Sequence, residues 1–272
     1  MNTRKKVIIL GAPASGKTNY LNASLQYFSV HSGENYRGIE VKSANEKMAK
    51  EFACITHQFQ DGCWFPKTQN FDCLELDIKY PWGENWLTRF LTFGLEVRVP
   101  LSFMDLSGEH FNALTGKEGE EMKTKAINHV KSCDAIMLLI DANRFINEDY
   151  MKKMEDNIAI LADLIDERMN ARNAKKNLKM SFVFTKVDML SNEWKANDGC
   201  KLKARLKSHY FSNLFNTLEW FNAEYEYFCV SCVPEDSVRS VSSHGGIKPN
   251  EKWLPVVMKE QVKPFYWLFD AL

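Results

Sequence analysis

Residues 11–18 read Gly-Ala-Pro-Ala-Ser-Gly-Lys-Thr, and this stretch constrains the fold more than any other part of the chain. The apolar residues 7–10 before it are typical of a buried strand, and residues 17–29 after it are typical of a helix. Two glycines separated by four residues, then lysine and threonine, predict a loop whose backbone N–H groups converge on phosphate oxygens. We therefore expect a strand, a phosphate-binding loop and a helix in that order, and we call residues 11–18 the phosphate loop.

Each residue type in the phosphate loop suits the binding of phosphate. Gly11 and Gly16 keep side-chain bulk out of the loop and permit unusual backbone angles. The helix that follows presents unsatisfied N–H groups and the positive end of its dipole to an anion. Lys17 is expected to reach the β and γ phosphates of a nucleoside triphosphate, and the Thr18 hydroxyl is expected to ligate Mg²⁺. The nucleotide contacts predicted in this part of the chain are Ala14, Ser15, Gly16, Lys17, Thr18 and Asn19.

The composition is that of an ordinary globular protein with a full core, because 45% of the 272 residues are hydrophobic and 26% are charged. The 35 basic and 35 acidic side chains cancel, so we expect no overall attraction to nucleic acid or to an anionic membrane. The longest apolar run, residues 135–140, is too short to span a bilayer, and no export signal is expected at the start. Seven cysteines then favour free thiols in a reducing compartment, and a cytoplasmic protein is expected.

Strand-like and helix-like patterns alternate along the chain, which predicts an α/β fold. We expect a three-layer sandwich with a mostly parallel sheet and one antiparallel strand pair, formed by residues 71–78 and 95–106. No linker or repeat interrupts the pattern, so residues 1–272 are predicted to form a single domain with an inserted helix near residues 45–60. The other strands are predicted at residues 5–10, 39–41, 135–140, 180–187 and 225–230, and the other helices at 17–29, 117–130, 147–173, 201–221 and near the end of the chain.

Three residues between the phosphate loop and the middle of the chain are candidates for binding Mg²⁺ or the terminal phosphate. Asp105 ends a predicted strand, where its carboxylate can hold the water shell of Mg²⁺, and Gly108 can direct its N–H to a γ-phosphate. Aspartate and glycine are also common in ordinary strand-end turns, so this pair alone does not decide the chemistry. Thr68 follows a turn-prone segment and is our choice for a second Mg²⁺-binding hydroxyl, although Thr56 and Thr88 lie in the same interval.

Residues 185–188 read Thr-Lys-Val-Asp and follow a predicted strand at a position in the chain that suits recognition of a base. The carboxylate of Asp188 can accept two parallel hydrogen bonds, which matches the N1–H and amino group of guanine and repels the N1 acceptor of adenine. A solvated loop is the ordinary alternative, because lysine and aspartate are common in such loops. After the last strand, backbone N–H groups can meet the guanine carbonyl. The base contacts predicted from these two stretches are Thr185, Lys186, Asp188, Ser231 and Cys232.

These motifs stand in the order of the five G motifs of Ras-like GTPases, and the chain resembles that translation-factor-related class of P-loop proteins over nearly its whole length. Residues 64–68 and 105–109 resemble the double-GTPase domains of bacterial conflict and anti-phage systems. The resemblance implies a Ras-like G domain that binds GTP with Mg²⁺, hydrolyses GTP to GDP and phosphate, and serves as a nucleotide-dependent switch in such a system. It further implies that Thr18, Thr68 and Asp105 hold the metal and that a protein partner reads the loops around Thr68 and Gly108.

Two residues depart from the pattern of the Ras-like family. Glu109 stands where many relatives carry the glutamine that orients the attacking water, and its charge beside the γ-phosphate is expected to slow intrinsic hydrolysis. Pro13 stands in the phosphate loop where small residues are usual, and it would hinder the customary approach of a partner's arginine. The catalytic residues that the resemblance implies are Lys17, Thr68, Gly108 and Glu109.

Two other functions remain open at this point. An ATP-dependent kinase of a small molecule or nucleotide would use a similar phosphate loop, but such kinases need a lid that carries arginines, and no arginine-rich segment is apparent. An interaction module that holds GTP without hydrolysing it would use Glu109 and the aromatic C-terminal helix for docking. Competition between GTP and ATP for binding distinguishes the kinase from the GTPase. Release of phosphate over many turnovers distinguishes the GTPase from the interaction module.

Overall fold

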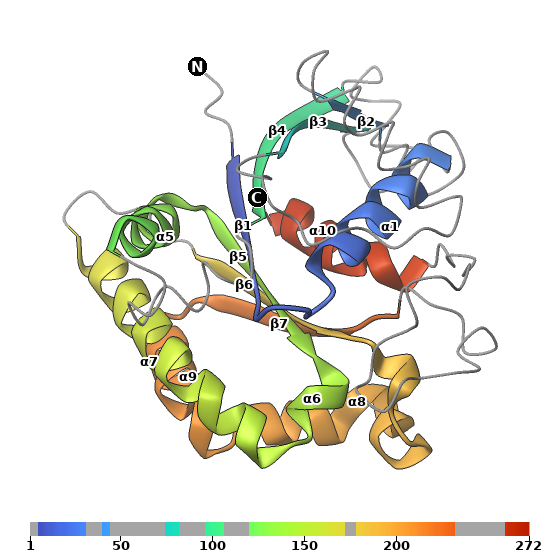
Figure 1. Ribbon diagram of the computed structural model, residues 1–272. Coiled ribbons are helices and arrows are strands. Elements are labelled where there is room, and N and C mark those ends of the chain that lie inside the picture. Colours follow the sequence, from blue (N-terminus) through green and yellow to red (C-terminus); the bar gives the residue numbers. More distant parts are fainter. Residues whose placement is uncertain are drawn as a thin grey trace.

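The computed structural model describes residues 5–30, 40–43, 74–81, 96–105, 120–171, 178–231 and 259–271. Helices and strands make up most of these segments (Figure 1). In chain order the elements are β1 (Lys5–Leu10), α1 (Lys17–Val30), β2 (Glu40–Ser43), β3 (Leu74–Pro81), β4 (Glu96–Asp105), α5 (Glu120–Ser132), β5 (Ala135–Asp141), α6 (Ala142–Phe145), α7 (Glu148–Asn170), β6 (Lys179–Thr185), the 3₁₀ helix η1 (Val187–Met189), α8 (Asn192–Leu206), the 3₁₀ helix η2 (His209–Phe211), α9 (Ser212–Trp220), β7 (Glu224–Cys229) and α10 (Lys259–Ala271).

The strands of the described residues form one sheet of seven, in the order β2-β3-β4-β1-β5-β6-β7. Strands β4, β1, β5, β6 and β7 pair in parallel, which confirms the predicted mostly parallel sheet. The predicted antiparallel pairing of β3 with β4 is present, but β2 also pairs antiparallel with β3, so the sheet has two antiparallel pairings where we expected one. Because neighbouring parallel strands end at the same edge, the segments that follow β1, β5, β6 and β7 meet there.

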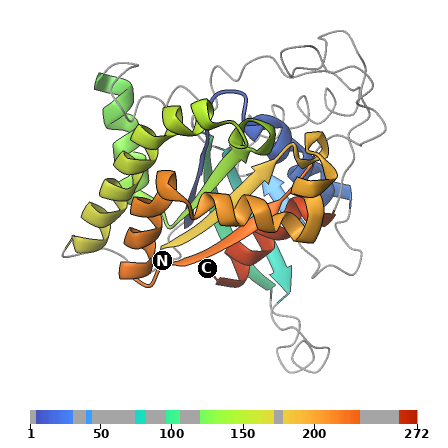
Figure 2. The same ribbon diagram turned by 90° about the horizontal axis from the view of Figure 1, so that it is seen from below.

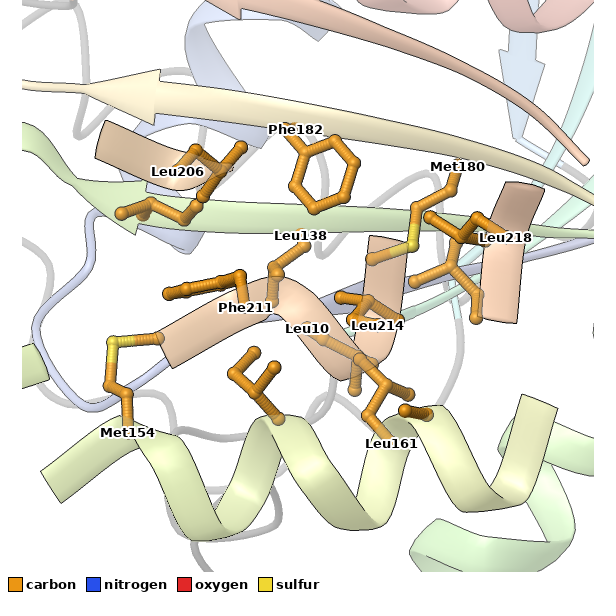
Figure 3. Packing of buried hydrophobic residues seen from close by; sticks show 14 of the residues in the cluster. Leu10, Leu138, Met154, Leu161, Met180, Phe182, Leu206, Phe211, Leu214 and Leu218 are labelled. Atoms are coloured by element: carbon orange, nitrogen blue, oxygen red, sulfur yellow. The ribbon is translucent and has the colours of Figure 1, made fainter. Parts of the chain in front are cut away.

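One face of the sheet holds a large apolar core. Leu138 of β5 and Phe182 of β6 are fully buried and lie in one cluster with Leu161 of α7 and Leu214 of α9 (Figure 3). All seven residues of β5 and all seven of β6 are buried, as expected for central parallel strands covered on both faces. Burying each large apolar side chain contributes roughly 1.5–3 kcal/mol, so this cluster is a main source of stability for the edge that follows these strands.

Helices α1 and α10 cover the opposite face of the sheet (Figure 1). The rings of Tyr20 in α1 and Phe265 in α10 stack with their centroids 5.7 Å apart, and both side chains are fully buried. Helix α10 also contacts β6 and β7, beside which it lies in the view from below (Figure 2). The C-terminal helix is therefore packed directly against the helix that follows the phosphate loop.

Two of the sequence-based boundaries are wrong. The helix predicted over residues 201–221 is two helices, because α8 ends at Leu206 and a turn with η2 precedes α9. This turn lets Phe211 become fully buried against Phe145, with ring centroids 6.0 Å apart, which a continuous helix would not allow. The strand predicted over residues 180–187 ends at Thr185, because Lys186 adopts a left-handed conformation with φ of 57°.

Other expectations concern segments without described structure or concern membranes. The inserted helix near residues 45–60 lies outside the described residues, and so do Thr68, Gly108, Glu109 and Cys232. None of the helices that the structure describes has the length and apolar character that a bilayer crossing requires. Within the described segments, Cys133, Cys200 and Cys229 take part in no disulfide.

Candidate nucleotide-binding site

The phosphate loop joins the end of β1 to the start of α1 and closes around the side chain of Lys17. Lys17 is 7% exposed, and its Nζ donates to the carbonyl oxygens of Gly11 at 2.9 Å and of Ala12 at 3.3 Å. The Ser15 N–H donates to the Ala12 carbonyl at 3.1 Å, so the loop is also bonded to itself. These contacts bury a positive charge at the N-terminal end of α1, where a helix already favours anions.

The two glycines of the loop are required for different steric reasons. A Cβ atom at Gly11 would lie 2.6 Å from the backbone oxygen of Leu139 and 2.7 Å from the Ser15 hydroxyl, so only hydrogen fits between β1 and β5 at this position. Gly16 has φ of +84°, a conformation that a side chain disfavours. The loop therefore has the close packing and backbone freedom that the sequence predicts for these residues.

The hydroxyl of Ser15 is the most direct indication that the loop takes a ligand. The side chain is 1% exposed, and its oxygen has no hydrogen-bond partner among the residues that the structure describes. A buried hydroxyl left unpaired costs about 1–3 kcal/mol, which a ligand oxygen can recover. A buried ammonium, an unpaired hydroxyl and a helix N-terminus together fit a phosphate group. The Asn19 side chain is partly exposed, and the Thr18 side chain lies outside the described part of the chain.

The end of β6 is bonded directly to the phosphate loop. The Thr185 hydroxyl donates to the Ser15 carbonyl at 2.6 Å and lies 3.3 Å from the Ile140 carbonyl. The Lys186 ammonium donates to the Ala14 carbonyl at 2.8 Å. Two adjacent residues of the predicted base motif therefore hold two adjacent carbonyl groups of the phosphate loop, although about 170 residues separate them in sequence.

Asp141, which the sequence analysis did not select, anchors the other side of Lys186. Its carboxylate is 2% exposed, and Oδ2 lies 2.7 Å from the Lys186 ammonium. Its Oδ1 accepts hydrogen bonds from the N–H groups of Asn143 and Arg144 and so caps the start of α6. The signal that could have identified it is its position, because it directly follows the buried run of residues 135–140 at the edge where parallel strands end.

These contacts hold Lys186 in a strained backbone conformation. A left-handed φ costs a residue with a side chain about 1–2 kcal/mol, and such strain persists only where surrounding contacts compensate for it. The bonds from the Lys186 ammonium to Ala14 and Asp141 supply that compensation. Beside them, burial and then the Asp141 charge raise the pKa of the Tyr150 phenol above its usual range, so this hydroxyl stays neutral next to the carboxylate.

Asp188 and Ser231 meet at the far end of the same edge. The Ser231 hydroxyl donates to Oδ1 of Asp188. The Val230 N–H donates to the Phe184 carbonyl at 2.8 Å, which extends the pairing of β6 with β7 just to this point. The sequence analysis expected a backbone contribution from Ser231, whereas its side chain makes the observed contact. Asp188 is partly exposed, and the bond from Ser231 holds its carboxylate in place.

The family of the chain follows from a comparison with family models. The model described as Double-GTPase 2 matches residues 88–242, which is more than half of the 272 residues. The chain belongs to the Double-GTPase 2 family. The matched residues of this Double-GTPase 2 chain include Asp105, the base motif at 185–188 and Ser231, whereas the phosphate loop precedes them.

Solved structures similar to this Double-GTPase 2 chain are distant ones. The signal recognition particle receptor complex SRb-GTP/SRX from Chaetomium thermophilum is 13% identical, with 85% of this chain and 92% of that chain covered and a TM-score of 0.47. The GTPase-like domain of S. cerevisiae Ski7, bound to GDP and inorganic phosphate, is 16% identical, with 99% and 50% covered and a TM-score of 0.44. A bacterial selenocysteine-specific elongation factor is 14% identical, with 84% and 26% covered and a TM-score of 0.34.

At these TM-scores the likenesses add nothing to the family assignment. The chain also spans only about half of the Ski7 domain and about a quarter of the elongation factor. No curated protein matches the chain.

The predicted metal ligands of this Double-GTPase 2 chain are placed only in part. Asp105 ends β4, and its backbone lies beside Ile9 of β1, two residues before the phosphate loop. Its side chain lies outside the described part of the chain, as do the side chain of Thr18 and all of Thr68. Among the residues that the structure does describe, no group of three acidic, histidine or cysteine side chains is arranged to hold a metal ion. The Mg²⁺ site therefore stays a prediction.

Proposed function

We propose that this chain binds GTP at the edge of the sheet formed by the ends of β1, β5, β6 and β7, and hydrolyses it to GDP and phosphate. The observation that carries the proposal is the pair of bonds from Thr185 and Lys186 to the phosphate loop. They fix the distance between the proposed base pocket and the proposed phosphate pocket before any ligand binds. Membership in the Double-GTPase 2 family supports the choice of guanine nucleotide.

The phosphate end would be bound by the buried groups of the loop. The Lys17 ammonium would exchange its bonds to the Gly11 and Ala12 carbonyls for phosphate oxygens, and the Ser15 hydroxyl would gain the acceptor that it lacks. Both groups would contact the phosphates of the leaving GDP, where charge builds up as the bond to the γ-phosphate breaks, and so would stabilise the transition state more than the ground state. Thr18, Thr68 and Asp105 would hold Mg²⁺, which neutralises charge on the phosphates when bound.

The base end would be read by Asp188. Its carboxylate would accept the N1–H and the amino group of guanine, and the bond from Ser231 would fix the plane in which these acceptors lie. The stem of Lys186 would lie along one face of the base while its ammonium stays on Ala14 and Asp141. Adenine would present an acceptor to the carboxylate, so ATP should bind poorly.

The finer parts of the proposal rest on the resemblance alone. Thr68 and Gly108 would sense the γ-phosphate, and a protein partner would read the loops around these two residues. Glu109 would orient the attacking water, and intrinsic hydrolysis would be slow. A role as a switch in a bacterial conflict system, within the cytoplasm, belongs to the same set of inferences. These segments lie outside the described residues, so mutagenesis must test them.

Displacement of a fluorescent GTP analogue from the full-length chain tests the proposal. Unlabelled GTP should displace it at a concentration at least a hundredfold below that of ATP, since two charge-assisted hydrogen bonds differ between the purines. Asp188→Asn should weaken GTP binding and improve XTP binding, because the asparagine amide can donate to the second carbonyl of xanthine. Equal displacement of the analogue by GTP and ATP would favour the kinase. Intact GTP binding after Lys17→Ala would show that the phosphate loop does not bind the nucleotide.

A further inference from the structure

Gln261 of α10 bonds to the chain at the proposed base pocket, although the sequence offers no motif around it. Its side chain is fully buried, and its Nε2 donates to the Ser231 carbonyl at 2.6 Å. The Ser231 hydroxyl in turn donates to the Asp188 carboxylate. A continuous path of two hydrogen bonds therefore runs from the C-terminal helix to the group that would read guanine.

The backbone of Gln261 also contacts α1. The Ser24 hydroxyl, which donates to the Tyr20 carbonyl at 2.8 Å, lies 3.3 Å from the Gln261 carbonyl, and one turn further along α10 the Phe265 ring stacks on Tyr20. Helix α1 begins at the phosphate loop, so α10 is packed on the phosphate side and bonded to the base side. The Gln261 amide is therefore a buried contact within a packed helix and not a mobile surface group.

The Ser231 carbonyl needs such a donor because the sheet ends immediately before it. Within the described part of the chain, the pairing of β6 with β7 ends with the bond from the Val230 N–H to the Phe184 carbonyl. Gln261 thus supplies a hydrogen bond to Ser231 just beyond the strand pairing, and Ser231 is the residue whose hydroxyl holds Asp188. Without it, the Ser231 carbonyl would lose the donor that holds the backbone from which the hydroxyl reaches Asp188.

We propose that Gln261 is a positioning residue for base specificity, which aligns Asp188 with guanine by holding the Ser231 carbonyl. This inference rests on the proposed function, since it concerns the same site. It assigns to the C-terminal helix a part in selecting the nucleotide. A purely packing role for the helix would instead affect folding and leave the choice of base unchanged.

The ratio of the dissociation constants of ITP and GTP measures this alignment, because inosine lacks the amino group that the second carboxylate oxygen would bind. In the full-length chain, Gln261→Met keeps the length of the side chain and removes the donor, and Gln261→Glu keeps the shape and places an acceptor against the Ser231 carbonyl. Both should lower the preference for GTP over ITP about fivefold, with ITP affinity changed by less than about twofold.

A matched control is Phe265→Leu, which loosens the same helix without touching Ser231. It should lower the midpoint of thermal unfolding and leave the ITP-to-GTP ratio unchanged. Ser231→Ala should lower the preference for GTP by itself, and adding Gln261→Met to it should change the ratio no further, because both act through one hydroxyl. An unchanged ratio in both Gln261 variants, an equal loss in Phe265→Leu, or additive losses in the double variant would overturn the inference.

Asp188→Asn separates this inference from the proposed function. If Asp188→Asn lowers the preference for GTP and the Gln261 variants do not, guanine recognition stands and the role of Gln261 is refuted. If Asp188→Asn also leaves the preference unchanged, the base site itself is elsewhere and both proposals fail.

Discussion

Replacing Asp141 with asparagine tests whether the two halves of the proposed site depend on one buried charge. The substitution preserves Oδ1 as the acceptor for the N–H groups of Asn143 and Arg144, and asparagine caps helices as well as aspartate does. It replaces Oδ2, the acceptor of the Lys186 ammonium at 2.7 Å, with an uncharged NH2 group. The perturbation is therefore confined to the interactions of Oδ2, which are the bond with Lys186 and the longer contact with the exposed Arg144.

The size of the effect follows from the surroundings of the pair. A hydrogen bond between charged groups contributes about 1.5–3 kcal/mol, but the Lys186 side chain is 31% exposed, so water replaces part of the lost interaction. We expect Asp141→Asn to lower the free energy of unfolding by about 1–2 kcal/mol. The left-handed backbone at Lys186 then loses one of its two compensating bonds, and the affinity for GTP should fall about tenfold.

Urea unfolding and titration with a fluorescent GTP analogue measure the two effects on the same samples. Asp141→Ala should cost about 1 kcal/mol more in stability than Asp141→Asn, because it also removes the cap of α6. Arg144→Gln is the matched control, since Arg144 lies 3.7 Å from the same carboxylate and is 47% exposed, and it should change stability by less than about 0.5 kcal/mol. Wild-type stability and wild-type affinity in Asp141→Asn would refute this account of the site.

Two further predictions concern other buried groups. Ser15→Ala removes a buried hydroxyl that has no partner among the described residues, so stability without nucleotide should stay equal or rise by up to about 1 kcal/mol while GTP affinity falls about fivefold; a clear loss of stability without nucleotide would contradict an unpaired hydroxyl. Burial raises the pKa of the Cys133 thiol to about 12, so at pH 8 roughly one molecule in ten thousand carries the thiolate. Mass spectrometry after brief alkylation of the native protein should therefore find the exposed Cys200 modified and Cys133 intact, and early modification of Cys133 would show that this part of the core opens readily.

The sequence predicts the sheet and the order of the motifs because both follow from patterns of a few neighbouring residues. The apolar run of residues 135–140 indicates a strand covered on both faces, and β5 is fully buried as that pattern requires. The spacing of glycines and lysine in the phosphate loop likewise specifies a local shape, which the close approach of Gly11 to Leu139 bears out. Such patterns depend on neighbours within a few residues, so no knowledge of the whole fold is needed.

What the sequence could not predict depends on contacts between distant segments. Residues 201–221 have helical spacing, yet the chain turns before Phe211 because that ring has a place to bury against Phe145. The pairing of β2 with β3 could not be predicted either, because the sequence of a short strand does not indicate which strand it pairs with. Gln261 is another such case, because its partner is 30 residues away and a lone glutamine in a helix is ordinarily exposed.

The buried polar groups at the edge of the sheet have two different roles in the proposed site. Asp141 and Gln261 bond to other groups of the protein and so fix the positions of Lys186 and Ser231. The Ser15 hydroxyl has no hydrogen-bond partner among the described residues and is left for a ligand. A site fixed in this way loses little conformational entropy on binding, and more of each contact with the ligand then appears as affinity. It follows that variants of the fixing residues should weaken binding by raising the entropic cost of ordering the site, whereas Ser15→Ala would remove a contact with the proposed ligand.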